Sequence, residues 1–190
     1  MPELAIIFIL LFGLIPFFYY LNLPLVYMQW TLIVIIVLLM IPLIKTLFNA
    51  PFVPSSKKRV KTMIKLADLN SKKRVIELGC GDGRIIREAA KIGVKDARGY
   101  EISLILILYA RIVGYFKKSS AKILYGDIWK QDYSNTDIIF SYLLPMIMPK
   151  VKEKIWSQLP SGAYFISNGF PLPDIKEDKK EEGVYLYIKK

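Results

Sequence analysis

The chain has 190 residues, enough for one ordinary domain and a short additional segment. Hydrophobic residues make up 54% of it, yet it carries 27 Lys and Arg against 16 Asp and Glu, a net charge of +11 at pH 7. The lack of histidine and the single cysteine exclude histidine acid–base catalysis, Ser-His-Asp triads, intramolecular disulfides and multi-cysteine zinc sites, and we expect no metal site.

The first 44 residues are almost free of charge, since Glu3 is the one charged side chain among them. Two uncharged stretches, residues 4–21 and 25–44, would each span roughly 27–30 Å as a helix, close to the hydrocarbon thickness of a bilayer. We therefore expect residues 1–48 to form a membrane anchor made of a transmembrane helical hairpin. A single signal-anchor helix, with the remainder lying in the membrane interface, is the alternative.

Every Lys and Arg lies from Lys45 onward, and several follow directly after the second uncharged stretch. Such residues favour the inner face of a membrane and attract anionic headgroups, so we expect a lipid bilayer as a partner. The remaining domain, residues 49–190, then lies on the cytoplasmic side, or on the matrix side in a mitochondrion. Because no Arg-rich transit peptide precedes the first stretch, we favour a prokaryotic plasma membrane over a mitochondrial inner membrane.

Short apolar runs alternate with stretches of helical spacing from Ser56 to Ile188. The predicted helices are residues 56–69, 84–92, 103–116 and 146–159. The predicted strands are residues 74–78, 97–100, 122–125, 137–143, 163–167 and 184–188. This order is typical of an α/β fold, and we expect a doubly wound, mostly parallel sheet of six strands with helices on both faces.

A glycine-rich turn follows the first predicted strand, at the position where sheets of this type bind ligands. Gly79, Gly81 and Gly83 give the spacing G-x-G-x-G, and glycine lets a bulky ligand lie directly on the main chain. Dinucleotide-binding turns have the spacing G-x-G-x-x-G, and their third glycine would fall at Arg84. Taken alone, the spacing also fits a purely structural turn.

Acidic residues accompany the glycines. Glu77 stands two residues before the first glycine, and Glu101 and Asp127 follow the second and third predicted strands. This arrangement resembles the Rossmann-like, S-adenosylmethionine-dependent methyltransferases, whose motif I reads (D/E)-x-G-x-G-x-G. The resemblance implies S-adenosylmethionine as the cofactor, with Glu77 near its methionine amino group, Glu101 at the ribose hydroxyls and Asp127 at the adenine amino group. The cofactor-binding residues that it implies are Glu77, Gly79, Cys80, Gly81, Asp82, Gly83, Glu101, Ile102, Asp127 and Ile128. For Cys80, packing within the loop is the alternative, because a buried thiol is usually inert.

Several longer stretches support a narrower resemblance. They are Ala50–Ser55, Gly79–Arg84, Asp127–Lys130, Asp137–Pro145 and Phe170–Pro173. Together they resemble the small membrane-anchored protein-lysine methyltransferases whose mitochondrial members modify the c subunit of ATP synthase and the adenine nucleotide translocase. That family usually has one hydrophobic segment, whereas this chain has two uncharged stretches. The resemblance implies a proline-aromatic loop that borders the substrate entry together with the end of the fourth strand. The residues expected there are Pro51, Phe52, Val53, Pro54, Leu144 and Pro145.

Methyl transfer from a sulfonium is an in-line displacement, which needs alignment and exclusion of water rather than a histidine base. An acceptor lysine must be neutral, and an apolar entry would favour its neutral form. We predict that Tyr142 is an active-site residue after the fourth strand and that Asp137 orients the incoming amine. Core packing of Tyr142 and a strand-capping role of Asp137 are the alternatives.

A tethered enzyme meets acceptors within its reach, so the expected function is lysine methylation of a membrane protein. Methylation of a membrane-resident lipid or quinone is one alternative, and a non-catalytic protein that binds the cofactor or a partner at the membrane is another. Nucleic acid is not expected as a partner, because the basic residues concentrate beside the uncharged stretches and the N-P-P-Y and D-P-P-Y signatures are absent. The acceptor, the number of methyl groups added and the oligomeric state stay open.

Overall fold

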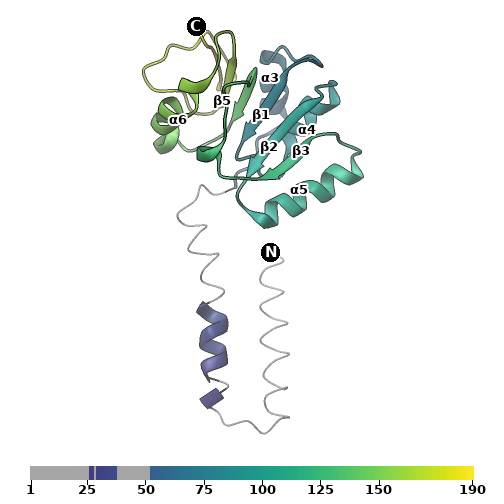
Figure 1. Cartoon of the computed structure of the whole chain (residues 1–190), viewed down its shortest axis with the longest axis vertical. Coiled ribbons are helices and arrows are strands. Elements are labelled where there is room, and N and C mark those ends of the chain that lie inside the picture. The colour runs from purple at the N-terminus through teal and green to yellow at the C-terminus, as the bar shows by residue number, and fades with distance from the viewer. Residues whose placement is uncertain (1–25, 28, 38–51) are drawn as a thin grey trace. The chain divides into compact units, whose positions relative to one another are not determined.

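The computed structural model describes residues 26–27, 29–37 and 52–190 (Figure 1). The chain divides into two compact units, of which the second begins at Phe52. The described residues of the first unit are helical, and apolar side chains such as that of Trp30 are exposed on them.

Much of the predicted anchor lies outside the described residues. This holds for the whole stretch 4–21 and for part of the stretch 25–44. In the part of the chain that the structure describes, we find no helix with both the length and the apolar character needed to cross a bilayer. The hairpin expected within residues 1–48 therefore stays a prediction.

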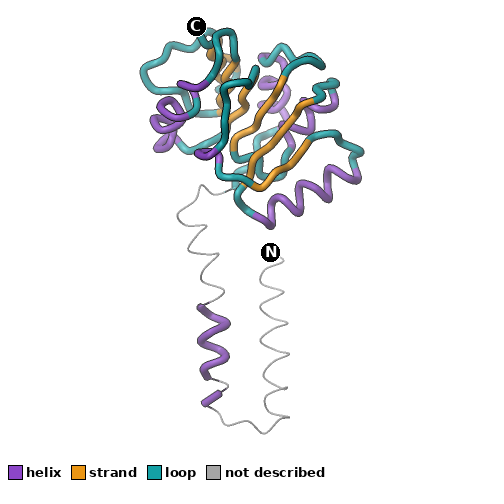
Figure 2. Tube along the Cα trace, in the orientation of Figure 1, coloured by secondary structure: helices purple, strands orange, loops and turns teal. Residues whose placement is uncertain are grey.

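The second unit contains a sheet of seven strands in the order β3-β2-β1-β4-β5-β7-β6 (Figure 2). The strands are β1 (Arg74–Leu78), β2 (Asp96–Glu101), β3 (Lys122–Tyr125), β4 (Ile138–Ser141), β5 (Tyr164–Asn168), β6 (Lys179–Glu181) and β7 (Val184–Ile188). β1 to β5 pair in parallel, and β7 runs antiparallel between β5 and β6. The predicted Rossmann-like, mostly parallel sheet is confirmed.

The prediction of six strands is wrong, because β6 adds a seventh at the edge of the sheet. Its sequence, Lys-Lys-Glu, contains none of the β-branched or aromatic residues that favour strands. The strand forms by pairing with β7 across a turn in which Glu182 and Gly183 both have positive φ. A partner strand, rather than local propensity, decides its conformation.

Helices cover both faces of this sheet, as predicted. They are α3 (Lys57–Leu66), α4 (Arg84–Lys91) and α5 (Leu104–Phe116) on one face and α6 (Met148–Lys154) on the other. On the first face Met63 and Ile86 belong to one core with Val75 of β1. On the second face Met148 of α6 belongs to another core with Ile76. Successive strand residues point to opposite faces, so Val75 and Ile76 contribute to different cores.

The predicted helix over residues 146–159 is divided into three short pieces. They are η2 (Pro145–Ile147), α6 and η3 (Trp156–Gln158). Proline has no N–H to donate and is tolerated in the first turn of a helix, and both Pro145 and Pro149 stand in such a first turn. The apolar spacing indicated one helix. Pro149, which cannot donate to the preceding turn, stands beside the first break, and the second break falls at Ile155. A further short piece, η1 (Ile128–Lys130), follows β3.

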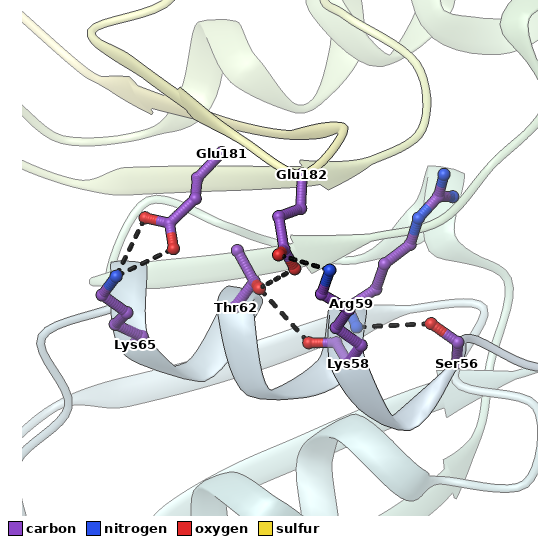
Figure 3. A network of polar contacts seen from close by, with 7 residues as sticks. All are labelled: Ser56, Lys58, Arg59, Thr62, Lys65, Glu181 and Glu182. Carbon is purple, nitrogen blue, oxygen red and sulfur yellow. Dashed lines mark hydrogen bonds and ion pairs between the residues drawn. The ribbon is translucent and has the colours of Figure 1, made fainter.

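Polar contacts fasten α3 to β6 and to the turn that follows it (Figure 3). Lys65 Nζ lies 2.8 Å from Glu181 Oε1, and Lys58 Nζ lies 2.7 Å from Glu182 Oε1. The hydroxyl of Thr62 donates to Glu182 Oε2 at 3.1 Å. Exposed ion pairs contribute little to stability, so these contacts mainly position α3 against the hairpin of β6 and β7.

A buried hydrogen bond of β7 gives a test of this packing. Tyr187 is fully buried, and its hydroxyl oxygen accepts from the main-chain N–H of Leu172 at 3.0 Å. Tyr187→Phe leaves that buried N–H without an acceptor, which costs about 1–3 kcal/mol. We expect the thermal unfolding midpoint of the whole chain in detergent to fall by several degrees. Tyr185→Phe is the matched control, because the Tyr185 hydroxyl makes no hydrogen bond among the described residues; equal midpoints for the two variants would contradict this assignment.

Candidate functional site

The candidate site lies at the carboxyl edge of the sheet, where the strand order reverses around β1. In open α/β sheets ligands bind at this point. Gly79–Gly83 follow β1, Glu101 ends β2, Tyr142 follows β4 and Asn168 ends β5. Most of the predicted site residues follow strands, and the fold therefore brings them together at this edge.

The loop after β1 requires glycine for its backbone and for its space. Gly79, Gly81 and Gly83 have φ values of +61°, +53° and +71°, in the left-handed region that glycine favours. A Cβ on Gly81 would lie 2.4 Å from Cε2 of the Phe52 ring. The predicted entry residue Phe52 therefore lies directly on the main chain of the glycine loop.

Glu101 joins this loop to the start of α5. One carboxylate oxygen, Oε2, accepts from the N–H of Gly81 at 2.9 Å. The other, Oε1, accepts from the N–H groups of Ile102 and Ser103 at 2.8 and 2.9 Å. Oε1 thus uses both of its lone pairs, whereas Oε2 has one left and can still accept from a ligand hydroxyl.

Glu77 is a second carboxylate beneath the loop, and it is buried. Burial raises the pKa of Glu77 to about 8, an effect opposed by the hydrogen bond from the Ile86 N–H and reinforced by the negative charges of Asp82 and Glu101. The N–H of Ile86 donates to Glu77 Oε2 at 2.9 Å. A positive charge placed nearby would favour the ionised form of this carboxyl.

Arg84 stands where a dinucleotide-binding turn would have its third glycine, and here its side chain holds two segments together. Its Nε and Nη2 donate to Asp82 Oδ1 and Oδ2 at 3.0 and 2.8 Å, and its Nη1 donates to the carbonyl oxygen of Ser55 at 2.7 Å. The hydrogen bonds to Asp82 raise the pKa of Arg84. Asp82 thus holds Arg84, which in turn holds the segment that precedes α3.

Three other predicted cofactor residues surround the ends of β2 and β3. Asp127 begins η1, and its Oδ1 accepts from the N–H of Trp129 at 3.0 Å. Ile102 is half exposed, and Ile128 is partly buried against the core on the α6 face. These positions provide an apolar and acidic border beside Glu101.

Cys80 is buried within the loop, and burial raises the pKa of its thiol. A Cβ on Gly99 of the neighbouring strand would lie 2.7 Å from both Cβ and Sγ of Cys80. The side chain therefore fills space that Gly99 leaves free, in agreement with the packing alternative.

A cavity of about 360 Å³ opens beside the loop. Residues from α3 and the segment before it, from the end of β4 and from the end of β5 line it: Pro54, Ser55, Ser56, Arg59, Tyr142 and Asn168. Asn168 donates from Nδ2 to Ser55 Oγ at 3.0 Å and accepts at Oδ1 from Arg59 Nη1 at 3.2 Å. The amide of Asn168 is therefore fixed in orientation, and Tyr142 lies on the same cavity.

The predicted site residues did not include four residues of this cavity, Ser55, Ser56, Arg59 and Asn168. Asn168 directly follows the predicted strand 163–167, so the rule used for the acidic residues would have found it. Ser55 and Arg59 had no comparable signal, because their role depends on where α3 packs. The hydroxyl of Ser141, at the end of β4, is buried and has no hydrogen-bond partner among the described residues.

Asp137 is not brought together with Tyr142. It precedes β4 at the amino edge of the sheet, where its Oδ2 accepts from the N–H of Arg74 at 2.7 Å. This position is that of a strand cap and lies at the opposite end of β4 from the cavity. The geometry gives no support to a role in orienting the amine.

The predicted entry residues are only partly gathered. Pro54 lines the cavity, whereas Val53 is exposed beside Phe52. Leu144 and Pro145 lie at the start of η2 after Tyr142. Pro51 lies outside the described residues.

The loop and its carboxylates fit a bulky cationic ligand. Glu77, Asp82 and Glu101 are close enough for the charges of the last two to raise the pKa of the first. A positively charged ligand bound at the glycine loop would offset this repulsion, which suits the sulfonium and amino groups of S-adenosylmethionine. Among the described residues, no group of three or more His, Cys, Asp or Glu side chains is placed to hold a metal ion.

Comparison with known proteins agrees with this geometry. The family model described as the ANTKMT methyltransferase domain matches residues 77–179. The chain is similar to the adenine nucleotide translocase lysine N-methyltransferase of Mus musculus, with 32% identity over 127 residues that cover 66% of this chain and 55% of that protein. It is also similar to a protein-lysine N-methyltransferase of Saccharolobus islandicus, with 30% identity over 151 residues that cover 74% of this chain and 94% of that protein. The chain thus spans little more than half the length of the mouse relative.

A solved structure has the same fold. The RNA methyltransferase of Salinibacter ruber, in complex with S-adenosyl-L-homocysteine, superposes with a TM-score of 0.66 at 30% identity. The match covers 72% of this chain and 92% of that one.

Gly81→Ala tests the contact between the loop and Phe52. The new methyl group would clash with the Phe52 ring, and we expect the affinity for S-adenosylhomocysteine to fall at least about tenfold, a loss of about 1.4 kcal/mol. Gly93→Ala is the matched control, because Gly93 also has a positive φ but has no neighbouring atom within 4 Å of its Cβ position. Isothermal titration calorimetry compares the two variants, and equal affinities would show that the clash has no effect on the site.

Glu77→Gln tests the raised pKa of this residue in the protein without cofactor. A carboxyl whose pKa rises from 4.5 to about 8 on folding makes the folded state less stable as pH increases between these values. Glutamine keeps an acceptor for the Ile86 N–H and has no charge. We expect equal unfolding free energies near pH 4 and a more stable variant at pH 8 and above, measured by denaturant titration; parallel pH profiles would disprove the assignment.

Proposed function

The chain belongs to the family of the ANTKMT methyltransferase domain, with S-adenosylmethionine as its cofactor, and on this premise we propose that it methylates a lysine side chain of a membrane protein. The observation that carries the proposal is the cavity beside the glycine loop, lined by Tyr142, Asn168 and Pro54. The cavity and the loop would bring an acceptor side chain and the cofactor to the same edge of the sheet.

We assign the cofactor to the loop and the neighbouring strand ends. Glu101 would accept from the ribose hydroxyls, Glu77 would face the methionine amino group, and Asp127 would contact the adenine amino group. Ile102 and Ile128 would border the adenine. When bound, S-adenosylmethionine supplies the methyl group, and its sulfur is the leaving group.

The residues of the cavity would prepare the acceptor lysine. With an unperturbed pKa of about 10.4, only about one lysine in 2,500 is neutral at pH 7. The guanidinium of Arg59 borders the cavity, and a like charge disfavours the ammonium form. Arg59 would therefore lower the pKa of the incoming lysine, which releases a proton to water before it attacks.

Tyr142 and Phe52 would align the neutral amine and exclude water. The hydroxyl oxygen of Tyr142 would accept a hydrogen bond from the amine, and the aromatic rings would cover the entry. Exclusion of water and alignment are the main contributions that a protein makes to an in-line displacement.

The choice of a membrane protein as acceptor rests on the proposed anchor. We propose that residues 1–48 hold the domain, residues 49–190, at a bilayer through two spans, 4–21 and 25–44. The charge pattern supports the inner face of a prokaryotic plasma membrane, or the matrix side of a mitochondrial inner membrane. A tether raises the effective concentration of acceptors in the same membrane.

A labelling experiment separates the candidate acceptors. The whole chain is incubated with membranes and methyl-labelled cofactor, with Gly81→Ala as the control for cofactor-dependent signal. Label in a protein band, recovered as methyl-lysine after hydrolysis, supports the proposal. Label in the organic extract indicates a lipid or quinone, label in the RNA fraction indicates nucleic acid, and cofactor binding without label indicates a non-catalytic protein.

Arg59→Gln tests how the acceptor becomes neutral. The variant keeps a donor for Asn168 and loses the positive charge beside the cavity. We expect the rising limb of the pH–kcat profile to move to higher pH by about one unit, so that activity at neutral pH falls about tenfold. Lys61→Gln, an exposed substitution on the same helix, should leave the profile in place. A change in KM with an unmoved pH profile would contradict the electrostatic role.

A further inference from the structure

The outer side of α5 carries an apolar stripe. In Figure 1 this helix lies along the outside of the sheet beside β3. Its exposed large hydrophobic side chains are Leu104, Ile105, Leu108, Tyr109, Ile112, Tyr115 and Phe116, which we call the α5 stripe. Their spacing puts them on one side of the helix, while Ile107 and Ala110 on the opposite side are buried against the sheet.

This exposure is unusual for a helix on the surface of a domain. Such a helix normally presents charged and polar residues to water. Here Leu108, Tyr115 and Phe116 are 62%, 81% and 78% exposed. A large contiguous apolar patch of this kind marks a surface that contacts a membrane or another protein.

Charge around the stripe favours an anionic partner. Between Ile102 and Gly126 the chain has four basic side chains and no acidic one. The four are Arg111, Lys117, Lys118 and Lys122, and all are exposed. A second copy of the chain, packed by a two-fold axis on this stripe, would bring the same cations together. A bilayer with anionic headgroups instead offers both the apolar and the acidic component.

The start of α5 also lies where the polypeptide enters the domain. Phe52, the first residue of the second unit, lies on Gly81. The N–H of Gly81 donates to the same Glu101 carboxylate that accepts from Ile102 and Ser103, the residues directly before α5. The chain that arrives from the predicted membrane stretches therefore joins the domain beside the N-terminal end of the stripe.

We propose that the α5 stripe lies in the interfacial layer of an anionic bilayer as a second membrane contact, in addition to the anchor. This inference rests on the proposed anchor and deepens the proposed function. Glu101 connects the stripe to the glycine loop, so the contact would hold the carboxyl edge of the sheet near the headgroups. An acceptor lysine close to the membrane surface would then be within reach of the cavity.

Spin labels placed on the stripe test the proposal in the whole chain. Leu108→Cys and Tyr115→Cys are labelled and reconstituted into vesicles of phosphatidylcholine and phosphatidylglycerol in equal parts. Ile92→Cys is the matched control, because Ile92 is also an exposed apolar residue, 51% exposed, and lies at the end of α4. The native chain, whose Cys80 is buried, gives the labelling background.

We expect labels on the stripe to be more accessible to oxygen than to a water-soluble nickel complex, and the label at position 92 to show the reverse order. Aqueous accessibility on the stripe, in a chain that floats with the vesicles, overturns this proposal and leaves the anchor standing. A chain that does not float overturns both. If neither reagent reaches the labels, protein covers the stripe. Spin–spin broadening that disappears on dilution with unlabelled chain shows a second copy there. Either result also overturns the proposal.

Discussion

The candidate site depends on the hydrogen bonds of the Glu101 carboxylate, which accepts from three main-chain N–H groups. This carboxylate joins the glycine loop after β1 to the start of α5, so two neighbouring crossover connections share one anion. Charged hydrogen bonds of this kind are stronger than neutral ones and fix geometry as well as energy. The shape of the loop, the covering Phe52 ring and the direction of α5 all depend on a side chain that also has capacity left for a ligand.

Much of the fold could be predicted from the sequence where local pattern and tertiary context agree. The strands at 74–78, 122–125 and 184–188 have the predicted bounds, because each is a compact apolar run between turn residues. The short strand β6 could not be predicted, because its charged sequence becomes a strand through pairing with β7. Apolar spacing also suggested one helix over 146–159, where the structure has three short pieces, with Pro149 beside the first break and Ile155 at the second.

The residues of the candidate site also differ in how far the sequence could predict them. Residues next to strand ends could be found, since a parallel sheet brings its carboxyl ends to one edge whatever the details of packing. Arg59 could not be found, because nothing in its helix marks it and its position depends on how α3 lies on β5 and β7. Asp137 is close to Tyr142 in sequence, yet β4 separates the two in space, which no sequence pattern near Asp137 indicates.

The fastening of α3 by Glu181 and Glu182 has a consequence for how the domain assembles during synthesis. Thr62 and Glu182 are 120 residues apart in the chain. α3 can pack on α4 as soon as both are made, since Met63 and Ile86 belong to one core, but its contacts with the turn after β6 need Glu182. Contacts of such sequence separation close late, because the entropy of a long loop must be lost before they form. A chain cut before β6 would lose the contacts of Glu181 and Glu182 with α3, the helix that places Arg59 on the cavity.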